Sequence, residues 1–240
     1  MSNEPVVVTD PVAVAALKRI YETSGPDNLE WDFSIPGQVT AQDGRLQVSD
    51  GVLTGLDLNR CHIADLSPLA GLTNLTELYL DRNGICDISP LANLTSLTTL
   101  NLEDNDIDDL SPLTDLSNLT TLNLEDNEIY DFLPLAGLVN LTTLYLRDTG
   151  LDDLSPLAGL TNLTTLYLDL DEINDWSPLA GLPHLTTLGL QLVLEDDLSP
   201  LACLTKLTTL IIFRYFPTSI ETIDLSPLDG LVNLKEIHWM

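Results

Sequence analysis

The chain has 240 residues and is 44% hydrophobic but only 5% aromatic, so its core must be built from leucine and isoleucine in one domain or one repeat array. It carries 37 Asp and Glu against 9 Lys and Arg, a formal net charge of −28. Nucleic acids and anionic membrane surfaces require a basic patch, so this balance argues strongly against both and permits a partner with a basic surface. No stretch approaches the roughly 18 apolar residues of a spanning helix, so membrane insertion is not expected.

Residues 1–50 do not repeat and are predicted to form a capping region of one helix and short strands. Asp10 as N-cap and Pro11 at the first helical position start the helix. Its apolar face is predicted to contain Val12, Ala16, Leu17, Ile20 and Tyr21. We expect this region to close the open edge of the first repeat, as terminal units of repeat arrays must.

Short strands with tight turns are expected at the end of this region. The dipeptides Asp43-Gly44 and Asp50-Gly51 are typical of such turns. The N-terminus lacks the features of a signal peptide, which predicts a cytoplasmic location for the chain as written, or a secreted or cell-surface one if it is an excised fragment. The cysteines, Cys61, Cys86 and Cys203, lack metal-ligand spacing and are predicted to be free and half-buried.

Residues 51–240 repeat with a period of 22, in about eight units and a partial ninth. One unit reads LTSLTTLNLEDNDIDDLSPLTD, residues 94–115. The Leu-x-Leu pair of each unit has the period of a strand with one buried face, and stacking of the units at about 4.8 Å builds a parallel sheet. The following Ser-Pro predicts a short helical turn, with Ser as N-cap. An insertion near residues 213–222 delays the last Ser-Pro.

Two polar columns of the repeat are predicted to be structural. The asparagines Asn83, Asn105 and Asn127 can satisfy backbone groups of the loop that follows each strand. The aspartates that precede each Ser-Pro or Leu-Pro, such as Asp65 and Asp109, are interpreted as turn residues and not as an acidic site.

The 22-residue unit and the signature DLSPLAGLTNLTTLYL resemble the internalin-type leucine-rich repeats of bacteria, and residues 1–50 resemble the caps of plant-type repeat proteins. The resemblance implies an α/β solenoid, a leucine-rich-repeat horseshoe. A parallel β-sheet would line its concave side, and short helical or 3-10 turns its convex side. It also implies a non-enzymatic module that binds another protein on the concave sheet.

Exposed positions on that sheet are the candidate binding residues, because the core does not dictate them. Tyrosine and amide side chains bury area and hydrogen-bond at low entropic cost. The alternative is that these residues merely suit a β surface. The predicted partner-binding residues in these columns are Tyr79, Asp81, Asn101, Glu103, Asn123, Glu125, Tyr145, Arg147, Tyr167 and Asp169.

An apolar patch is predicted where the last repeats depart from the consensus. Contiguous exposed apolar surface marks an interface, whereas a locally rearranged core would explain the same residues without one. The residues of this predicted patch are Leu170, Leu192, Ile211, Phe213, Tyr215 and Phe216. At the end of the chain, Ile237 and Trp239 fall at buried strand positions, where Trp239 is expected to plug the open end of the core. The alternative is that the chain is truncated there, in which case the exposed edge would favour pairing with another chain.

The sequence offers little for catalysis. His62, His184 and His238 occupy different repeat positions, no Gly-rich phosphate loop is present, and no cofactor or metal site is predicted. The favoured function is protein binding by a monomer, with self-association through the C-terminal edge left open. Two alternatives remain: an intracellular regulatory scaffold for a signalling enzyme, and a structural or Ca²⁺-binding array that uses Glu103/Glu125 and Asp104/Asp126/Asp148.

Overall fold

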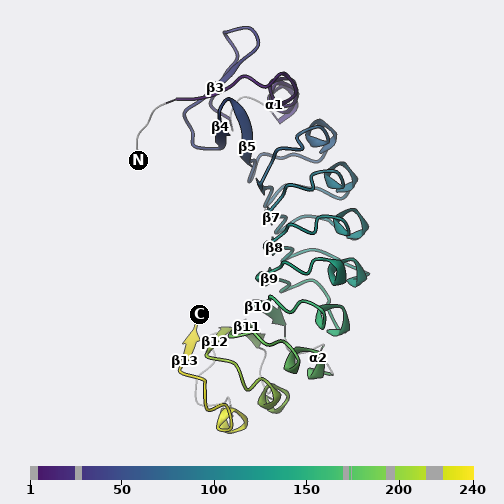
Figure 1. The fold of residues 1–240 in the computed structure, drawn as a ribbon, viewed down its shortest axis with the longest axis vertical. Helices are drawn as coiled ribbons and strands as arrows, with labels where there is room; N and C mark the ends of the chain where they lie inside the picture. Colours follow the sequence, from purple (N-terminus) through teal and green to yellow (C-terminus); the bar gives the residue numbers. More distant parts are fainter. Residues whose placement is uncertain (1–4, 25–28, 170–172, 174, 193–197, 215–223) are drawn as a thin grey trace.

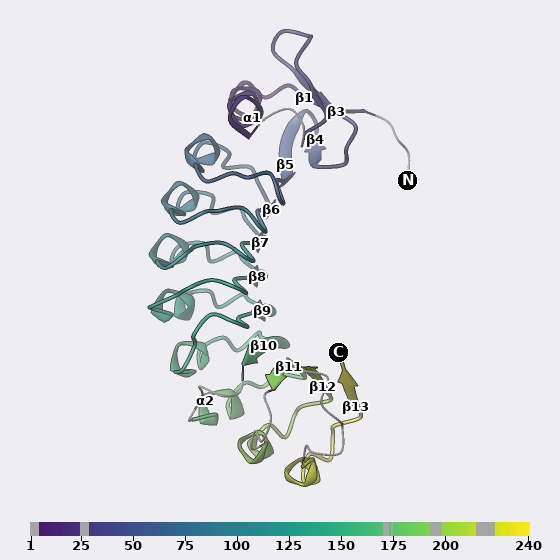
Figure 2. The ribbon, with the colours of Figure 1, turned by 180° about the vertical axis from the view of Figure 1, so that it is seen from behind.

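The computed structural model describes residues 5–24, 29–169, 173, 175–192, 198–214 and 224–240. They form a curved solenoid in which strands line the inner side of the arc and short turns line the outer side (Figures 1 and 2). The predicted leucine-rich-repeat horseshoe is therefore confirmed. No helix in the described part of the chain is both long and apolar enough to cross a membrane.

One sheet runs along the whole concave side. Its order follows the chain, with β4 and β5 antiparallel and all later neighbours parallel. Identical repeat positions lie side by side, as Leu100 and Leu122 do. The strands are β4 (Leu46–Ser49), β5 (Val52–Asp57), β6 (Glu77–Tyr79), β7 (Thr99–Asn101), β8 (Thr121–Asn123), β9 (Thr143–Tyr145), β10 (Thr165–Asp169), β11 (Thr187–Leu192), β12 (Thr209–Arg214) and β13 (Glu236–Trp239).

The convex side is built from one short turn per repeat, nearly always a 3-10 turn. The turns are η2 (Ser67–Leu69), η3 (Ser89–Leu91), η4 (Ser111–Leu113), η5 (Leu133–Gly137), η6 (Ser155–Leu157), the α-helical turn α2 (Ser177–Ala180), η7 (Ser199–Cys203) and η9 (Ser226–Leu228). The prediction that Ser is the N-cap was wrong, because Ser is the first residue of the turn. The carboxylate two residues earlier accepts its N–H instead, as Asp65 Oδ1 does from Ser67 at 2.8 Å.

The core is one continuous column of leucines and isoleucines between the sheet and the turns. Both leucines of the strand motif are buried in repeat after repeat, for example Leu100, Leu102, Leu122 and Leu124 at 0% exposure. Burial on this scale supplies the main free energy that holds the array together, because no single repeat can cover its own apolar face.

The asparagine column connects each repeat to the one before it. Asn127 is buried and donates to the carbonyls of Leu102, Leu124 and Glu125 at 2.9 to 3.1 Å. It also accepts the N–H of Ile107 at 3.0 Å. Asn83 and Asn105 donate to backbone carbonyls in the same pattern, which confirms the predicted structural role of this column.

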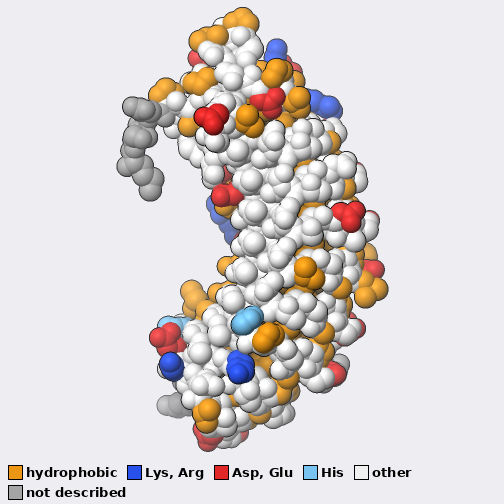
Figure 3. Space-filling view, viewed as in Figure 1, with side chains coloured by type: hydrophobic (Ala, Val, Ile, Leu, Met, Phe, Trp, Pro, Cys, Tyr) orange, Lys and Arg blue, Asp and Glu red, His pale blue; other side chains and the backbone are white. Residues whose placement is uncertain are grey.

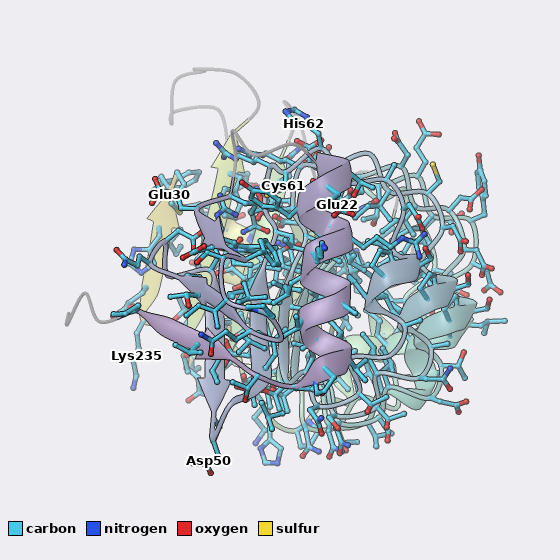
Figure 4. The ribbon with its side chains drawn as sticks, turned by 90° about the horizontal axis from the view of Figure 1, so that it is seen from above. Glu22, Glu30, Asp50, Cys61, His62 and Lys235 are labelled. Carbon is cyan, nitrogen blue, oxygen red and sulfur yellow. The ribbon has the colours of Figure 1, made fainter. Side chains whose placement is uncertain are left out.

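The N-terminal region covers the first repeat with a helix and a small antiparallel sheet. The helix α1 (Pro11–Ser24) begins where predicted, with the Val12 N–H bonded to Asp10 Oδ1 at 3.2 Å. Figure 4 looks onto this end and shows α1 lying across the end of the solenoid. The small sheet has the order β1 (Val6–Val8), β3 (Val39–Ala41), β2 (Trp31–Asp32).

One residue of the predicted helix face was placed wrongly. Val12 is 52% exposed, and Ala13 at 0% is buried in its place, together with Ala16, Leu17 and Ile20. Val12 lies at the margin of the helix against Gly71, where a shallow groove separates α1 from η2.

The predicted tight turns at Asp43-Gly44 and Asp50-Gly51 are present. Gly44 has φ 77°, and Asp50 and Gly51 have φ 51° and 80°, which are the left-handed values that such turns require.

All three cysteines are free, but their predicted half-burial was wrong: Cys61 is buried, whereas Cys86 and Cys203 are exposed. Cys61 belongs to the buried core, and Arg45 Nη1 lies 3.6 Å from its sulfur.

The C-terminal end of the sheet is β13. Ile237 and Trp239 pack against the core and remain partly exposed. The insertion predicted near residues 213–222 lies almost entirely outside the described residues. So do the predicted patch residues Leu170, Tyr215 and Phe216, and the side chain of Leu192.

Candidate partner-binding surface on the concave sheet

The predicted binding residues form two parallel columns across the strands. The central column contains Tyr79, Asn101, Asn123, Tyr145 and Tyr167, aligned in register from β6 to β10. The second column follows the second buried leucine of each repeat and contains Asp81, Glu103, Glu125, Arg147 and Asp169. Apart from the buried Glu125, these side chains are half-buried and accessible from the concave side.

In the N-terminal half of this surface, the polar side chains form hydrogen bonds with neighbouring side chains and backbone N–H groups. Asn101 Oδ1 accepts the Glu103 N–H at 3.0 Å, and Asn123 Oδ1 accepts the Glu125 N–H at 3.0 Å. Asn123 Nδ2 also donates to Glu103 Oε2 at 3.0 Å. These bonds form a ladder from repeat to repeat, so the two asparagines hold the surface together as well as facing solvent.

In the C-terminal half, three aromatic rings and one guanidinium gather into a cluster. We call Tyr145, Tyr167, Phe213 and Arg147 the aromatic cluster. The rings of Tyr145 and Tyr167 are stacked, with centroids 4.6 Å apart and planes 11° from parallel. The Phe213 ring lies 5.9 Å from that of Tyr167 at 55°, and the Arg147 guanidinium carbon lies 4.0 Å from the Phe213 centroid.

The cluster exists because one strand position between its members has no side chain. Gly189 stands in register beside Tyr167 in β11. A Cβ built on Gly189 would lie only 2.1 Å from Tyr167 Cδ1, far inside van der Waals contact. The Tyr167 ring therefore occupies the space above Gly189, between the strands that carry Tyr145 and Phe213.

Arg147 is fixed from both sides. Its guanidinium makes two hydrogen bonds to the buried carboxylate of Glu125, with Nη2 to Oε2 at 2.9 Å. These bonds are the main cause that raises the pKa of Arg147. Glu125 on one side and the Phe213 ring on the other hold the cation in one orientation on the surface.

The two stacked tyrosines present hydroxyl groups that the protein itself does not use. Among the residues that the structure describes, neither phenol has a hydrogen-bond partner, whereas Tyr79 donates to Glu77 Oε2 at 3.1 Å. Partial burial is the main cause that raises the pKa of both Tyr145 and Tyr167. Both therefore stay protonated at neutral pH and can donate to a partner.

The matching family model is that of Leucine Rich repeats (2 copies), at residues 52–93, 95–137 and 139–181. The structure is similar to internalin C2 from Listeria monocytogenes, at 32% identity and a TM-score of 0.68, over 99% of this chain and 100% of that one. The chain belongs to the internalin-like leucine-rich-repeat proteins.

Two further structures extend the comparison. An internalin (inlF) from Listeria monocytogenes is 29% identical with a TM-score of 0.67, over 96% of this chain and 71% of that one. The ectodomain of the Arabidopsis receptor kinase HAESA is 18% identical with a TM-score of 0.67, over 96% of this chain and 42% of that one, which shows the fold alone. A search of curated protein sequences found no match.

Leucine-rich-repeat proteins of this class generally bind other proteins and are generally not enzymes.

Acidic residues are the other marked feature of the concave side of this internalin-like chain. Burial, followed by the charge of Glu103, raises the pKa of Asp81. Burial also raises the pKa of Asp126, with Asp148 as the next cause. Among the described residues, no group of His, Cys, Asp or Glu is arranged to hold a metal ion.

Of the predicted apolar patch, the structure describes the side chains of Ile211 and Phe213, both half-buried. Both lie on the concave side, and Ile212 between them is buried at 0% exposure. From the sequence, Phe213 and Tyr167 were predicted to belong to separate features, the apolar patch and the central column, and no role was predicted for Gly189. The available signal was the glycine itself, since it stands where the neighbouring repeats have Tyr167 and Ile211.

Proposed function

We propose that this internalin-like protein binds another protein on its concave sheet, with the aromatic cluster as the anchor. The observation that carries the proposal is the stacked pair Tyr145 and Tyr167, which lies on the concave side beside Phe213 and whose hydroxyls have no hydrogen-bond partner in the described part of the chain. Rigid aromatic side chains with a polar end are the residues that most often dominate binding energy.

The surrounding charge supports a partner with a basic surface. The second column carries Asp81, Glu103, Glu125 and Asp169, and its one cation, Arg147, is already paired with Glu125. The whole chain has a net charge of −28. A basic partner would be attracted from a distance, and its association would slow as salt is added.

The test is affinity capture with the intact immobilised protein, comparing two tyrosine substitutions. The double variant Tyr145→Ala/Tyr167→Ala removes the stacked pair, and Tyr79→Ala removes a tyrosine of the same column that is bonded to Glu77. We expect the double variant to lose captured partners about thirtyfold or more, because a central aromatic anchor contributes about 2 kcal/mol or more. The Tyr79→Ala protein should retain them.

Melting temperatures of the variants serve as the folding control. Equal recovery of every partner by a double variant that melts like the wild type would exclude the aromatic cluster as the anchor. A loss with Tyr79→Ala as large as that with the double variant would move the binding site to the N-terminal half of the sheet.

A further inference from the structure

On the convex side, one repeat departs from the others at two exposed positions. Tyr130 and Leu133 flank Asp131 at the start of η5, and they are 80% and 66% exposed. The equivalents of Leu133 in the other repeats are serines, and those of Tyr130 in the two adjacent repeats are Asp108 and Asp152. Because the repeats share one local fold, the residues at the same positions in the other repeats show which side chains that fold requires.

In the two adjacent repeats, the serine forms a side-chain hydrogen bond that Leu133 cannot form. Ser111 Oγ donates to Asp109 Oδ2 at 2.8 Å, and Ser155 Oγ donates to Asp153 Oδ2 at 2.6 Å. Leu133 keeps only the backbone bond, from its N–H to Asp131 Oδ1 at 2.9 Å. Leu133 therefore lacks the side-chain hydrogen bond and is also largely exposed, so the stability of the fold does not explain why a leucine stands at this position.

The surroundings of this pair are acidic and lack a compensating cation. Neighbouring turns η4 and η6 pack against η5. The segments just before these two turns carry exposed carboxylates, those of Asp108, Asp109, Asp152 and Asp153. No Lys or Arg occurs between Arg82 and Arg147. Figure 3 shows hydrophobic side chains next to acidic ones on the convex margin of the middle repeats.

We propose that Tyr130 and Leu133 form a docking surface for a protein segment that carries Lys or Arg beside an apolar side chain. The apolar pair would contact the apolar side chain, and the flanking carboxylates would pair with the cations. A second copy of this chain is a poor occupant, because it would bring an equally acidic rim against this one. The surface lies on the opposite side from the aromatic cluster and is independent of the proposed concave site.

The test replaces both residues by those of the sister repeats, as Tyr130→Asp/Leu133→Ser. The variant should melt at or above the wild-type temperature, because it restores the serine hydroxyl bond to Asp131. The probe is a short synthetic amphipathic helix of lysine and leucine, titrated at about 0.15 M salt, where the screening length is about 8 Å. We expect the variant to bind this peptide about tenfold more weakly than the wild type.

Two controls test whether the apolar contact is required and whether binding is independent of the aromatic cluster. A peptide of lysine and glutamine with the same charge should bind both proteins weakly and equally, because it lacks the apolar contact. The Tyr145→Ala/Tyr167→Ala protein should bind the lysine and leucine peptide like the wild type, with hydrogen-exchange protection at residues 128–136 in both.

Three results would overturn the proposal. The first is equal affinity of wild type and Tyr130→Asp/Leu133→Ser for the lysine and leucine peptide. The second is protection that appears on the concave strands instead of residues 128–136. The third is a wild-type dimer in sedimentation that this variant abolishes, since a second copy would then be the occupant.

Discussion

At the scale of single residues, side chains that satisfy backbone groups decide how each repeat turns. Asn127 serves four backbone groups at once, three carbonyls and one N–H, while it is only 4% exposed. In the next repeat Thr149 takes this position and donates only to the Leu146 carbonyl, at 2.7 Å. Asparagine is therefore the residue that best links one repeat to the previous one at this depth.

We predict that Asn127→Ala lowers the free energy of unfolding by about 2–4 kcal/mol, because it leaves buried carbonyls and one N–H without partners. Denaturant unfolding followed by circular dichroism measures the loss. Asn118→Ala is the matched control, since Asn118 makes one exposed bond to the Thr95 carbonyl at 2.8 Å. A loss no larger than that of the control would mean that water replaces the asparagine without cost.

At the scale of elements, the absence of a side chain at one position of a strand determines which neighbouring side chains can meet. β11 separates Tyr167 on β10 from Phe213 on β12, and Gly189 leaves the space in which the Tyr167 ring lies. Side chains on next-nearest strands thereby come into contact, although parallel strands two apart are separated by about 10 Å.

We predict that Gly189→Ala displaces the Tyr167 ring and breaks the aromatic cluster, while the unfolding free energy changes by less than about 1 kcal/mol. The stability effect is small because the ring can swing toward solvent. Near-ultraviolet circular dichroism should show the loss of the tyrosine signal, and capture of partners should fall. Gly159→Ala is the control, because nothing lies within 4 Å of its added Cβ. An unchanged tyrosine signal in Gly189→Ala would contradict the packing described above.

At the scale of the whole molecule, two sets of aspartates titrate with opposite consequences. Hydrogen bonds from the following serine lower the pKa of Asp65, Asp87, Asp153 and Asp175. Their contribution to stability is complete above the unfolded-state value of about 3.9 and is lost as the pH falls below it. Burial raises the pKa of Asp81 and Asp126, so each opposes folding while charged and stops doing so once protonated.

We therefore predict a melting temperature that rises as the pH is lowered from about 7 to about 4, and falls below about pH 4. The rise comes from protonation of Asp81 and Asp126 together with relief of repulsion within a chain of net charge −28. The fall comes from protonation of the carboxylates that bond to the turns. Thermal melts at constant ionic strength measure the curve. A melting temperature that falls steadily from neutral pH would show that neither repulsion nor the two raised pKa values matter.

The repeat and its core were determined by the sequence alone. A period of 22 with leucines two apart allows one solution, because a three-residue strand buries its apolar side chains only by stacking on identical units. For the same reason, the role of Asn127 could be inferred without coordinates. The capping role of the aspartates could not, because a turn signal does not say which side chain accepts the N–H.

The tertiary structure decided which concave residues are free to bind. Asn101 and Asn123 looked equivalent to Tyr145 and Tyr167 in the sequence. Among the described residues, however, the asparagines are hydrogen-bonded into a ladder and the tyrosine hydroxyls have no partner. The contacts that build the aromatic cluster join residues up to three strands apart, as Arg147 and Phe213 are. They depend on side-chain rotamers and on the space over Gly189, which a linear pattern does not encode. The sequence therefore determined the scaffold, and the packing between its strands selected the surface.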